Sequence, residues 1–169
     1  APEARVVKGA HVLERTQVLP GLVDEVFAFF GEPRNLEAIT PPFLRFRVEG
    51  MDTPELGAET HIDYSLRLHG LPLRWRTRIT EWEPPHHFVD LQLKGPYRLW
   101  HHHHSFRQVE DPDTGAPLVE VTDRVDFTVL SAAPLLRPLE RAVEALFVRR
   151  DVARIFDFRT KRLAELLTP

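Results

Sequence analysis

The fold is decided by Trp100-His101-His102-His103-His104-Ser105-Phe106, which sets four consecutive histidines between two large aromatic residues. Side chains at positions i, i+2 and i+4 of a β-strand lie on the same face. Alternation therefore predicts that one face carries Trp100, His102, His104 and Phe106, and that the other two histidines lie opposite. Large aromatic rings favour burial. We expect the face with the rings to point inward, as part of an apolar cavity with a polar centre.

Seven strands are predicted in all. They cover residues 11–19, 43–48, 59–68, 71–82, 88–93, 97–108 and 118–130, and the last six are separated by turn-rich sequences such as His69-Gly70 and Lys94-Gly95-Pro96. Short separators favour antiparallel neighbours joined as hairpins. The strand pattern therefore predicts one antiparallel sheet.

Helices are predicted at two places. After the first strand, residues 22–30 and 34–39 form two short helices, and the second ends at Thr40-Pro41-Pro42 because a residue before proline leaves the helical region. Residues 134–167 have the length and the Leu, Ala, Arg and Glu content of one long helix. Its predicted apolar stripe consists of Leu139, Val143, Leu146, Phe147, Ile155, Phe156, Leu163 and Leu166.

This order of elements predicts an α+β fold in which a curved seven-stranded antiparallel sheet wraps around the long C-terminal helix. Two arrangements remain open. The helix either packs against the sheet as a simple core, or leaves a ligand cavity of roughly 300–1,000 Å³ between them. We expect the segment Thr40-Pro41-Pro42-Phe43 to cover one end of the sheet, with Phe43 as a plug and the turn at His69-Gly70-Leu71 as a second lip.

Composition excludes several classes of protein. The 169 residues fit one domain, 1–169, and the net charge of −3 argues against a general grip on nucleic acid. The chain has no cysteine, which excludes disulfides and thiolate chemistry. No apolar run approaches the roughly 20 residues that span a bilayer, so no stable membrane insertion is expected. With no signal-peptide core at the start of the sequence, we expect a cytoplasmic protein.

The inner face of the sheet is predicted from alternation in the other strands. It carries Ile62, Tyr64, Leu66, Leu68, Leu73, Trp75, Thr77, Ile79, Val121, Asp123, Val125, Phe127 and Val129, which leaves Arg74, Arg76 and Arg78 outside. A buried carboxylate is costly without a partner. We therefore expect Asp123 to pair with His102 or His104, in a network that leaves one imidazole nitrogen facing the ligand.

The strand at residues 88–93 has two possible inner faces. One contains Phe88, Asp90 and Gln92, and the other contains Val89, Leu91 and Leu93. Alternation alone does not choose between them.

Several short motifs occur, each once, in a fixed order along the whole chain. They are Val26-Phe27-Ala28-Phe29-Phe30, Asn35-Leu36, Ile39-Thr40-Pro41-Pro42, Trp75, Trp82-Glu83-Pro84-Pro85, Phe88-Val89-Asp90-Leu91-Gln92, Gly95-Pro96-Tyr97, Trp100, His102, His104, Phe106, Asp123 and Ile155-Phe156-Asp157-Phe158-Arg159. This order resembles the START-like (SRPBCC, Bet v 1-like) superfamily, and most closely its ligand-binding SRPBCC group. Ser131-Ala132-Ala133-Pro134 departs from the glycine-rich segment that such relatives often carry. The resemblance implies a helix-grip fold and a pocket for a hydrophobic ligand.

Three functions remain open. The first is binding of a small hydrophobic or amphipathic ligand, lipid- or polyketide-like. The resemblance also implies a polyketide cyclase/dehydrase-like enzyme as an alternative, with His102, His104 and Asp123 as candidate acid–base residues. The third is an accessory protein in stress or cell division that acts through an unknown protein partner.

The predicted ligand-binding residues combine the inner face with the histidine cluster. They are Tyr64, Leu66, Trp75, Thr77, Asp90, Gln92, Trp100, His102, His104, Phe106 and Asp123. The spacing of His102 and His104 suits two ligands of one metal, but His-x-His alone is a weak signal. We expect no metal and no cofactor.

Overall fold

The structure is a computed structural model that describes residues 10–129 and 138–168, apart from the side chains of residues 129–147. Along the chain the elements are β1 (His11–Pro20), α1 (Val23–Phe30), α2 (Asn35–Ala38), the 3₁₀ helix η1 (Pro42–Leu44), β2 (Arg47–Met51), β3 (His61–Leu68), β4 (Leu71–Glu83), β5 (His87–Lys94), β6 (Tyr97–Glu110), β7 (Pro117–Val129) and α3 (Pro138–Leu167). The predicted order of strand, short helices, six strands and long helix is confirmed.

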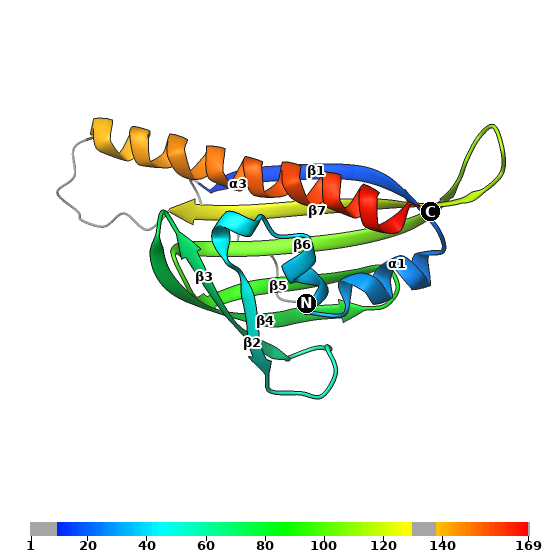
Figure 1. Cartoon of the computed structure of the whole chain (residues 1–169), viewed down its shortest axis with the longest axis horizontal. Helices are drawn as coiled ribbons and strands as arrows, with labels where there is room; N and C mark the ends of the chain where they lie inside the picture. Colours follow the sequence, from blue (N-terminus) through cyan, green and yellow to red (C-terminus); the bar gives the residue numbers. More distant parts are fainter. Residues whose placement is uncertain (1–9, 130–137, 169) are drawn as a thin grey trace.

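All seven strands belong to one antiparallel sheet with the order β1-β7-β6-β5-β4-β3-β2. Strands β2 to β7 follow one another as hairpins, and β1 adds to the far edge by pairing with β7. Figure 1 shows α3 running along β1 and β7, with α1 on the same side of the sheet. The α+β helix-grip architecture expected from the sequence is therefore the observed one.

Strand alternation explains which side chains the sheet buries. On β6, His102 is 5% exposed and His104 is 3% exposed, whereas His101 and His103 are half-buried on the other face. The predicted parity of the histidines is confirmed. On β5, Phe88 is buried on the same face as Asp90, which settles the inner face of that strand in favour of this pair.

The start of β2 differs from the prediction of a strand at residues 43–48. Pro42 opens a 3₁₀ turn, and Arg45 closes it with a left-handed φ of 45°, so the strand begins only at Arg47. Proline fixes its own φ near the helical value, which favours the turn over an extended start. Likewise β3 begins at His61 and not at the predicted residue 59, because Glu59 has a φ of 68°.

The apolar stripe of α3 is partly corrected. Phe156 and Leu163 are buried as predicted, Ile155 is partly buried, and Leu166 is 42% exposed because it lies in the last turn of the helix. The other predicted members, Leu139, Val143, Leu146 and Phe147, lie outside the described side chains, as does Val129. The segment Ser131-Ala132-Ala133-Pro134 also lies outside the described residues.

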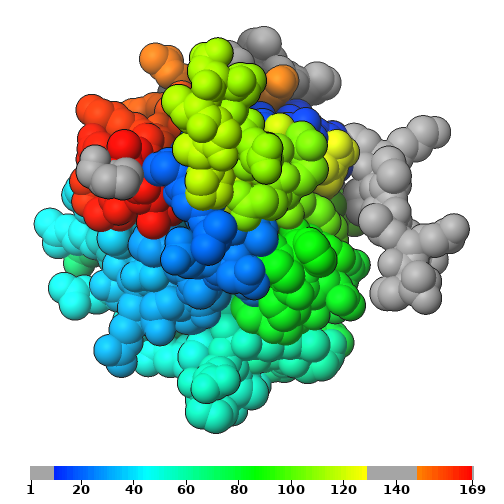
Figure 2. Space-filling model, turned by 90° about the vertical axis from the view of Figure 1, so that its right-hand side faces the viewer, coloured from blue at the N-terminus to red at the C-terminus, as the bar shows by residue number. Residues whose placement is uncertain are grey.

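The core consists of two clusters on the concave face. One gathers rings of α1, β5 and β6, namely Phe27, Phe30, Phe88 and Phe106, and the other joins Trp100 and Phe127 of the sheet to Phe156 of α3. Trp75 packs against both clusters. At one end of the molecule, α1 lies between the C-terminal end of α3 and the strands β4 and β5 (Figure 2). No helix in the described part of the chain is long and apolar enough to cross a membrane.

Candidate functional site

A cavity of about 120 Å³ lies where the two core clusters meet. Its walls come from α1, α2, the segments around β2, the strands β3 to β6, and α3. The lining residues are Phe30, Pro33, Leu36, Phe46, Leu56, Ile62, Tyr64, Trp75, Ile79, Phe88, Asp90, Trp100, His102, His104 and Arg159. Simple core packing without a void is thereby excluded, because a cavity of this size holds more than one water molecule.

The cavity is smaller than the roughly 300–1,000 Å³ expected for a pocket that takes a drug-sized ligand. Aromatic rings account for the difference, because Trp75 packs edge-on against Trp100 at 5.2 Å and against Tyr97 at 5.6 Å. Alternation predicts which rings point inward. It does not predict how much of the space they fill.

The structure brings part of the predicted site together at this cavity. The predicted residues that line it are Tyr64, Trp75, Asp90, Trp100, His102 and His104. Five others do not line it, although each lies on the predicted strand: Leu66, Thr77, Gln92, Phe106 and Asp123.

The uncharged polar residues that do not line the cavity, Thr77 and Gln92, form hydrogen bonds with other groups of the protein. Thr77 donates from Oγ1 to the Leu91 carbonyl oxygen at 3.2 Å, and lies 3.4 Å from the Asp90 carboxylate. Gln92 donates from its side-chain amide to the Tyr97 carbonyl oxygen at 2.6 Å. These contacts explain why an inward position did not make either residue a wall of the cavity.

The apolar members and Asp123 lie behind or beside the cavity wall. Phe106 packs between Phe27 and Phe30, with ring centroids 5.2 and 5.0 Å away, and Leu66 lines a separate surface groove. Asp123 is 6% exposed and contacts both buried histidines from β7.

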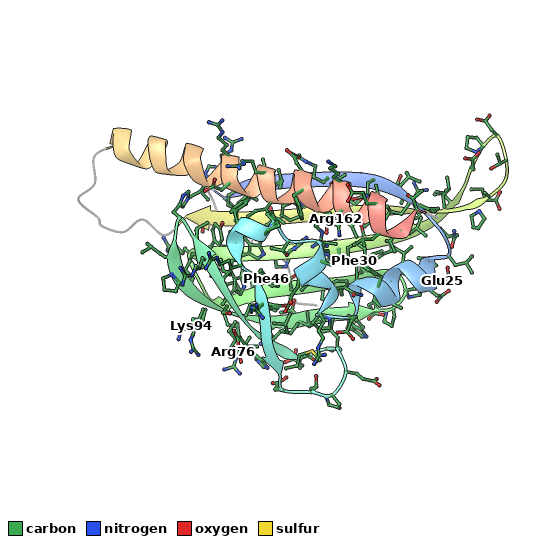
Figure 3. All side chains as sticks on the ribbon, viewed as in Figure 1. Glu25, Phe30, Phe46, Arg76, Lys94 and Arg162 are labelled. Atoms are coloured by element: carbon green, nitrogen blue, oxygen red, sulfur yellow. The ribbon has the colours of Figure 1, made fainter. Side chains whose placement is uncertain are left out.

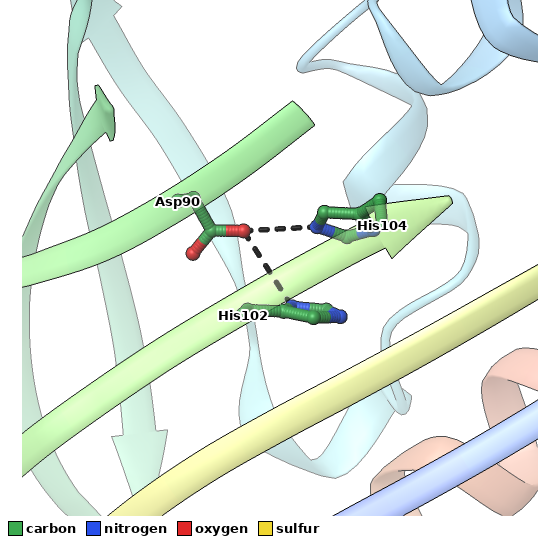
Figure 4. Close-up of side chains that lie close together, drawn as sticks. All are labelled: Asp90, His102 and His104. Carbon is green, nitrogen blue, oxygen red and sulfur yellow. Dashed lines mark hydrogen bonds and ion pairs between the residues drawn. The ribbon is translucent and has the colours of Figure 1, made fainter. Parts of the chain in front are cut away.

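The two buried histidines lie between two carboxylates. His104 places Nε2 at 2.9 Å from Asp90 and Nδ1 at 2.8 Å from Asp123. His102 places Nε2 at 2.9 Å from Asp123, and its Nδ1 lies 3.5 Å from Asp90. Figure 4 shows Asp90 facing both imidazoles. The Nε2 atom of each histidine is hydrogen-bonded to a carboxylate, and each Nδ1 lies within 3.5 Å of one. That one imidazole nitrogen faces a ligand stays a prediction.

The surroundings shift the pKa values of the two histidines in opposite directions. Burial disfavours the charged form of His104, but its hydrogen bonds to Asp123 and Asp90 outweigh burial and raise its pKa. Burial and the neighbouring His104 lower the pKa of His102 to about 4, against the opposing effect of Asp123. The surroundings therefore favour the charged form of His104, whereas His102 is neutral at neutral pH.

The carboxylates remain ionised in spite of burial. Burial raises the pKa of Asp123, but Arg159 and the two histidines outweigh burial and hold this pKa well below its ordinary value. The same histidines, with a contribution from Arg159, lower the pKa of Asp90. Two negative carboxylates thus face the positive Arg159 and His104, the histidine whose charged form they favour, and this pairing compensates the buried charges.

Arg159 on α3 is the charged residue of the cavity wall that the predicted ligand-binding set did not include. Its Nε lies 3.2 Å from Asp123 Oδ2, and its guanidinium carbon lies 5.1 Å from the Phe30 ring centroid. Nε forms no hydrogen bond in the described part of the chain, although the residue is 7% exposed. A signal was available, because helical spacing puts Arg159 in one stripe with Val152, Phe156 and Leu163.

The same cluster contains the atoms of a possible metal site. Ligand atoms of Asp90, His102 and His104 lie within 4.8 Å of one another, and two imidazoles with one carboxylate are a donor set that binds Zn²⁺ or Fe²⁺. Here, however, His104 uses both nitrogens on carboxylates, and the positive Arg159 lies against the same group. We therefore describe the cluster as ion-paired.

The rim of the cavity differs from the prediction in one residue. Phe43 is 53% exposed, and the guanidinium carbon of Arg154 lies 5.4 Å from the Phe43 ring centroid. Phe43 therefore does not plug an opening. Phe46 lines the cavity in its place and packs against Tyr64, with ring centroids 4.9 Å apart and the rings tilted by 35°. Figure 3 shows Phe46 on the segment between η1 and β2, and Phe30 at the end of α1. The predicted second lip, at His69, is tied to α3 by a 2.7 Å contact with Asp151.

Comparison with known proteins gives a sequence match and several structural ones. The sequence profile of the family described as "Polyketide cyclase / dehydrase and lipid transport" matches residues 10–168. No curated protein sequence matches the chain significantly.

Three solved structures illustrate the structural similarity. Zhui aromatase/cyclase from Streptomyces sp. R1128 has 18% identity and a TM-score of 0.62, with 90% of this chain and 93% of that chain covered. Ginseng major latex-like protein 151 from Panax ginseng has 12% identity and a TM-score of 0.62, over 95% and 99%. The di-domain ARO/CYC StfQ of the steffimycin biosynthetic pathway has 16% identity and a TM-score of 0.69, over 94% of this chain and 50% of that one. At these identities the structures share the fold.

Proposed function

Because the chain belongs to the polyketide cyclase / dehydrase and lipid transport family of the SRPBCC superfamily, we propose that it binds a small hydrophobic or amphipathic molecule between the sheet and α3. The observation that carries this proposal is the cavity itself. Its wall is aromatic and aliphatic, with its ionisable groups Asp90, His102, His104 and Arg159 gathered in one cluster. Ligand pockets combine an apolar wall with a few polar groups in this way.

Two polar groups at the wall suit a ligand with a polar end. Tyr64 is 7% exposed, lines the cavity, and its hydroxyl forms no hydrogen bond with the described residues. Asp90 keeps 18% of its side chain exposed, more than His102 or His104. This hydroxyl is not one of the fully buried atoms without a partner, so a ligand in the cavity can reach it and form a hydrogen bond with it.

The small volume requires part of the wall to move for a larger ligand. The wall includes Leu36, Phe46 and Leu56, which are half-buried and lie on short segments outside the long strands. Loops and short helices rearrange more readily than paired strands. We therefore place adaptation to the ligand on this side of the cavity.

The test is retention and displacement of an apolar molecule. Native mass spectrometry after gentle purification would reveal a retained ligand, and titration with Nile red would measure binding directly. Leu36→Trp fills the cavity and should weaken Nile red binding about tenfold or more. Leu118→Trp, a substitution of equal size on β7 away from the cavity, should leave binding unchanged. Equal effects of both substitutions, or no binding by the unsubstituted protein, would contradict the proposal.

A cyclase/dehydrase-like reaction is the second candidate, favoured by the presence of Asp90, His102 and His104 at the cavity wall. Such side chains act as general acids and bases when they reach the substrate. We rank it second because each ring nitrogen lies within 3.5 Å of a carboxylate and the lowered pKa of Asp90 makes it a weak base. Turnover of a cyclisable poly-β-ketone thioester, lost in His102→Gln, would place catalysis first.

A further inference from the structure

A second hollow lies beside the cavity, at the end of the sheet formed by β2, β3 and β4. It is a surface groove of about 990 Å³. Its lining includes four arginines, Arg45, Arg47, Arg67 and Arg74. Apolar side chains complete it, Leu66 and Leu73 among them. We refer to this hollow as the arginine groove.

Strand pairing explains why the arginines gather. Arg47 on β2 lies opposite Ser65 on β3, and Ser65 lies opposite Arg74 on β4. Arg67 is two residues beyond Ser65 and shares its face of the strand. Adjacent strands are about 4.8 Å apart, so these cations lie within roughly two strand spacings of one another. Like charges close together destabilise a sheet, so the sheet itself gives no reason for this group of arginines.

The arginine groove has an excess of positive charge. Its four arginines form no ion pair with any residue that the structure describes. Its one lining acid, Glu37, already accepts a hydrogen bond from the Val48 backbone at 2.9 Å. On the neighbouring part of β4, by contrast, Arg76 pairs with Asp63 and Arg78 pairs with Glu59.

Phe46 is the wall that the arginine groove shares with the inner cavity. Its half-buried ring lines both spaces and packs at a tilt against Tyr64 in the cavity wall. Arg45 directly before it has a left-handed φ of 45°, a conformation that residues with a side chain rarely adopt. Rotation of the Phe46 ring would join the charged groove outside to the apolar cavity inside.

We propose that the arginine groove binds the anionic head of an amphipathic ligand whose apolar chain passes Phe46 into the cavity. The ligand class is a single-chain carboxylate or phosphate monoester. This inference rests on the proposed function, since it needs the cavity to hold the chain. Arginine suits such heads because its planar guanidinium binds carboxylate and phosphate through two hydrogen bonds at once.

The test compares three twelve-carbon probes that differ in the head. Dodecyl phosphate, dodecanoate and 1-dodecanol are titrated as competitors of Nile red at low ionic strength. The two anions should bind about tenfold more tightly than the alcohol, and salt should reduce the difference. Arg47→Gln combined with Arg74→Gln should bring all three affinities together and leave that of dodecanol unchanged.

The matched control uses arginines of the same sheet that are already paired. Arg76→Gln combined with Arg78→Gln removes the same charge and should preserve the preference for anions. Equal affinities for dodecanol and dodecyl phosphate in the unsubstituted protein would overturn the inference and leave the proposed function intact. Failure of every probe to displace Nile red, or of Nile red to bind, would overturn both.

A membrane surface is the competing source of the anionic head. Cosedimentation with vesicles of phosphatidylcholine and phosphatidylserine distinguishes it from a free amphiphile. Vesicle binding that the Arg47→Gln and Arg74→Gln pair abolishes, with no preference among the free probes, would assign the groove to a lipid surface and overturn the proposal. Phe46→Ala supplies an independent check: it should accelerate dissociation of dodecyl phosphate and dodecanol alike, and an unchanged rate would contradict the role of Phe46.

Discussion

Asp123 on β7 and His104 on β6 are direct cross-strand partners, and their side chains meet at 2.8 Å on the inner face of the sheet. The pairing register that holds β6 to β7 therefore also fixes the buried carboxylate against the imidazole. Arg159 approaches the same carboxylate from α3. The cluster is built into the sheet and closed by the helix.

Removal of the Asp123 charge should destabilise the protein strongly. Asp123→Asn leaves the buried charges of His104 and Arg159 with one carboxylate fewer, and should lower the free energy of unfolding by about 3 kcal/mol or more. Urea denaturation followed by tryptophan fluorescence measures it. Asp126→Asn is the control on the same strand, where the partner is the half-exposed Arg124 and the expected loss is below about 1 kcal/mol. Similar losses in the two variants would show that the buried cluster contributes no more than a surface pair.

Acidification should weaken the fold through His102. Its pKa is about 4 in the folded protein and about 6.5 when unfolded, so between these values the unfolded chain binds more protons and stability falls as pH falls. The loss is on the order of 3 kcal/mol by pH 4. The raised pKa of His104 acts in the opposite sense, because its contribution is present below pH 6.5 and is lost as pH rises.

The pH effect is tested with unfolding curves of His102→Gln at several values between pH 6.5 and 4.5. This variant should lose less stability on acidification than the unsubstituted protein. His101→Gln, on the outer face of the same strand, should follow the unsubstituted protein. Parallel pH profiles for all three proteins would remove His102 as the cause.

The effect of each histidine on ligand affinity should depend on whether its side chain lies on the inner or the outer face of β6. His102→Gln and His104→Gln alter the cavity wall and should weaken Nile red binding about tenfold, which corresponds to about 1.4 kcal/mol. His101→Gln and His103→Gln, on the other face, should change it less than about twofold. Isothermal titration at pH 7 gives the four affinities. An equal or larger loss at the odd positions would mean that the ligand lies on the other side of the sheet.

The Tyr64 hydroxyl should matter to the ligand and not to the fold. Tyr64→Phe removes no hydrogen bond within the described residues, so the free energy of unfolding should change by less than about 0.5 kcal/mol. Affinity for 1-dodecanol should fall several-fold, while Nile red binding stays within about twofold. Tyr97→Phe, buried but outside the cavity wall, is the matched control. A loss of stability without a loss of affinity would assign the hydroxyl a structural role.

The sequence predicts the sheet well because alternation is a property of each strand alone. The inward positions of Tyr64, His102 and Asp123 follow from it and are observed. The errors occur where a single residue leaves the regular backbone. Arg45 and Glu59 have left-handed φ values, and neither residue type signals this in advance.

The candidate site was harder to predict because it depends on contacts between elements. Thr77 and Gln92 point as predicted, but bond to Leu91 and Tyr97 and so leave the wall. Arg159 reaches the cluster from a helix far along the chain, and an arginine within an apolar stripe is more often drawn out to solvent. Local periodicity does not indicate which of these contacts forms.

The position of Arg159 on α3 bears on the kinetics of exchange. Lifting α3 from the sheet would carry Arg159 away from Asp123 and leave a buried negative charge uncompensated, at a cost of several kcal/mol. The helix is thus the stationary part of the molecule, and the short segments from α2 to β2, which contact α3 through Phe43 and Ala38, are the ones free to rearrange. Loop motions of that kind take nanoseconds to microseconds, whereas collective helix movements take microseconds to milliseconds. Residence times of bound molecules should therefore be set by their contacts with these short segments, Phe46 among them, and not by a movement of α3.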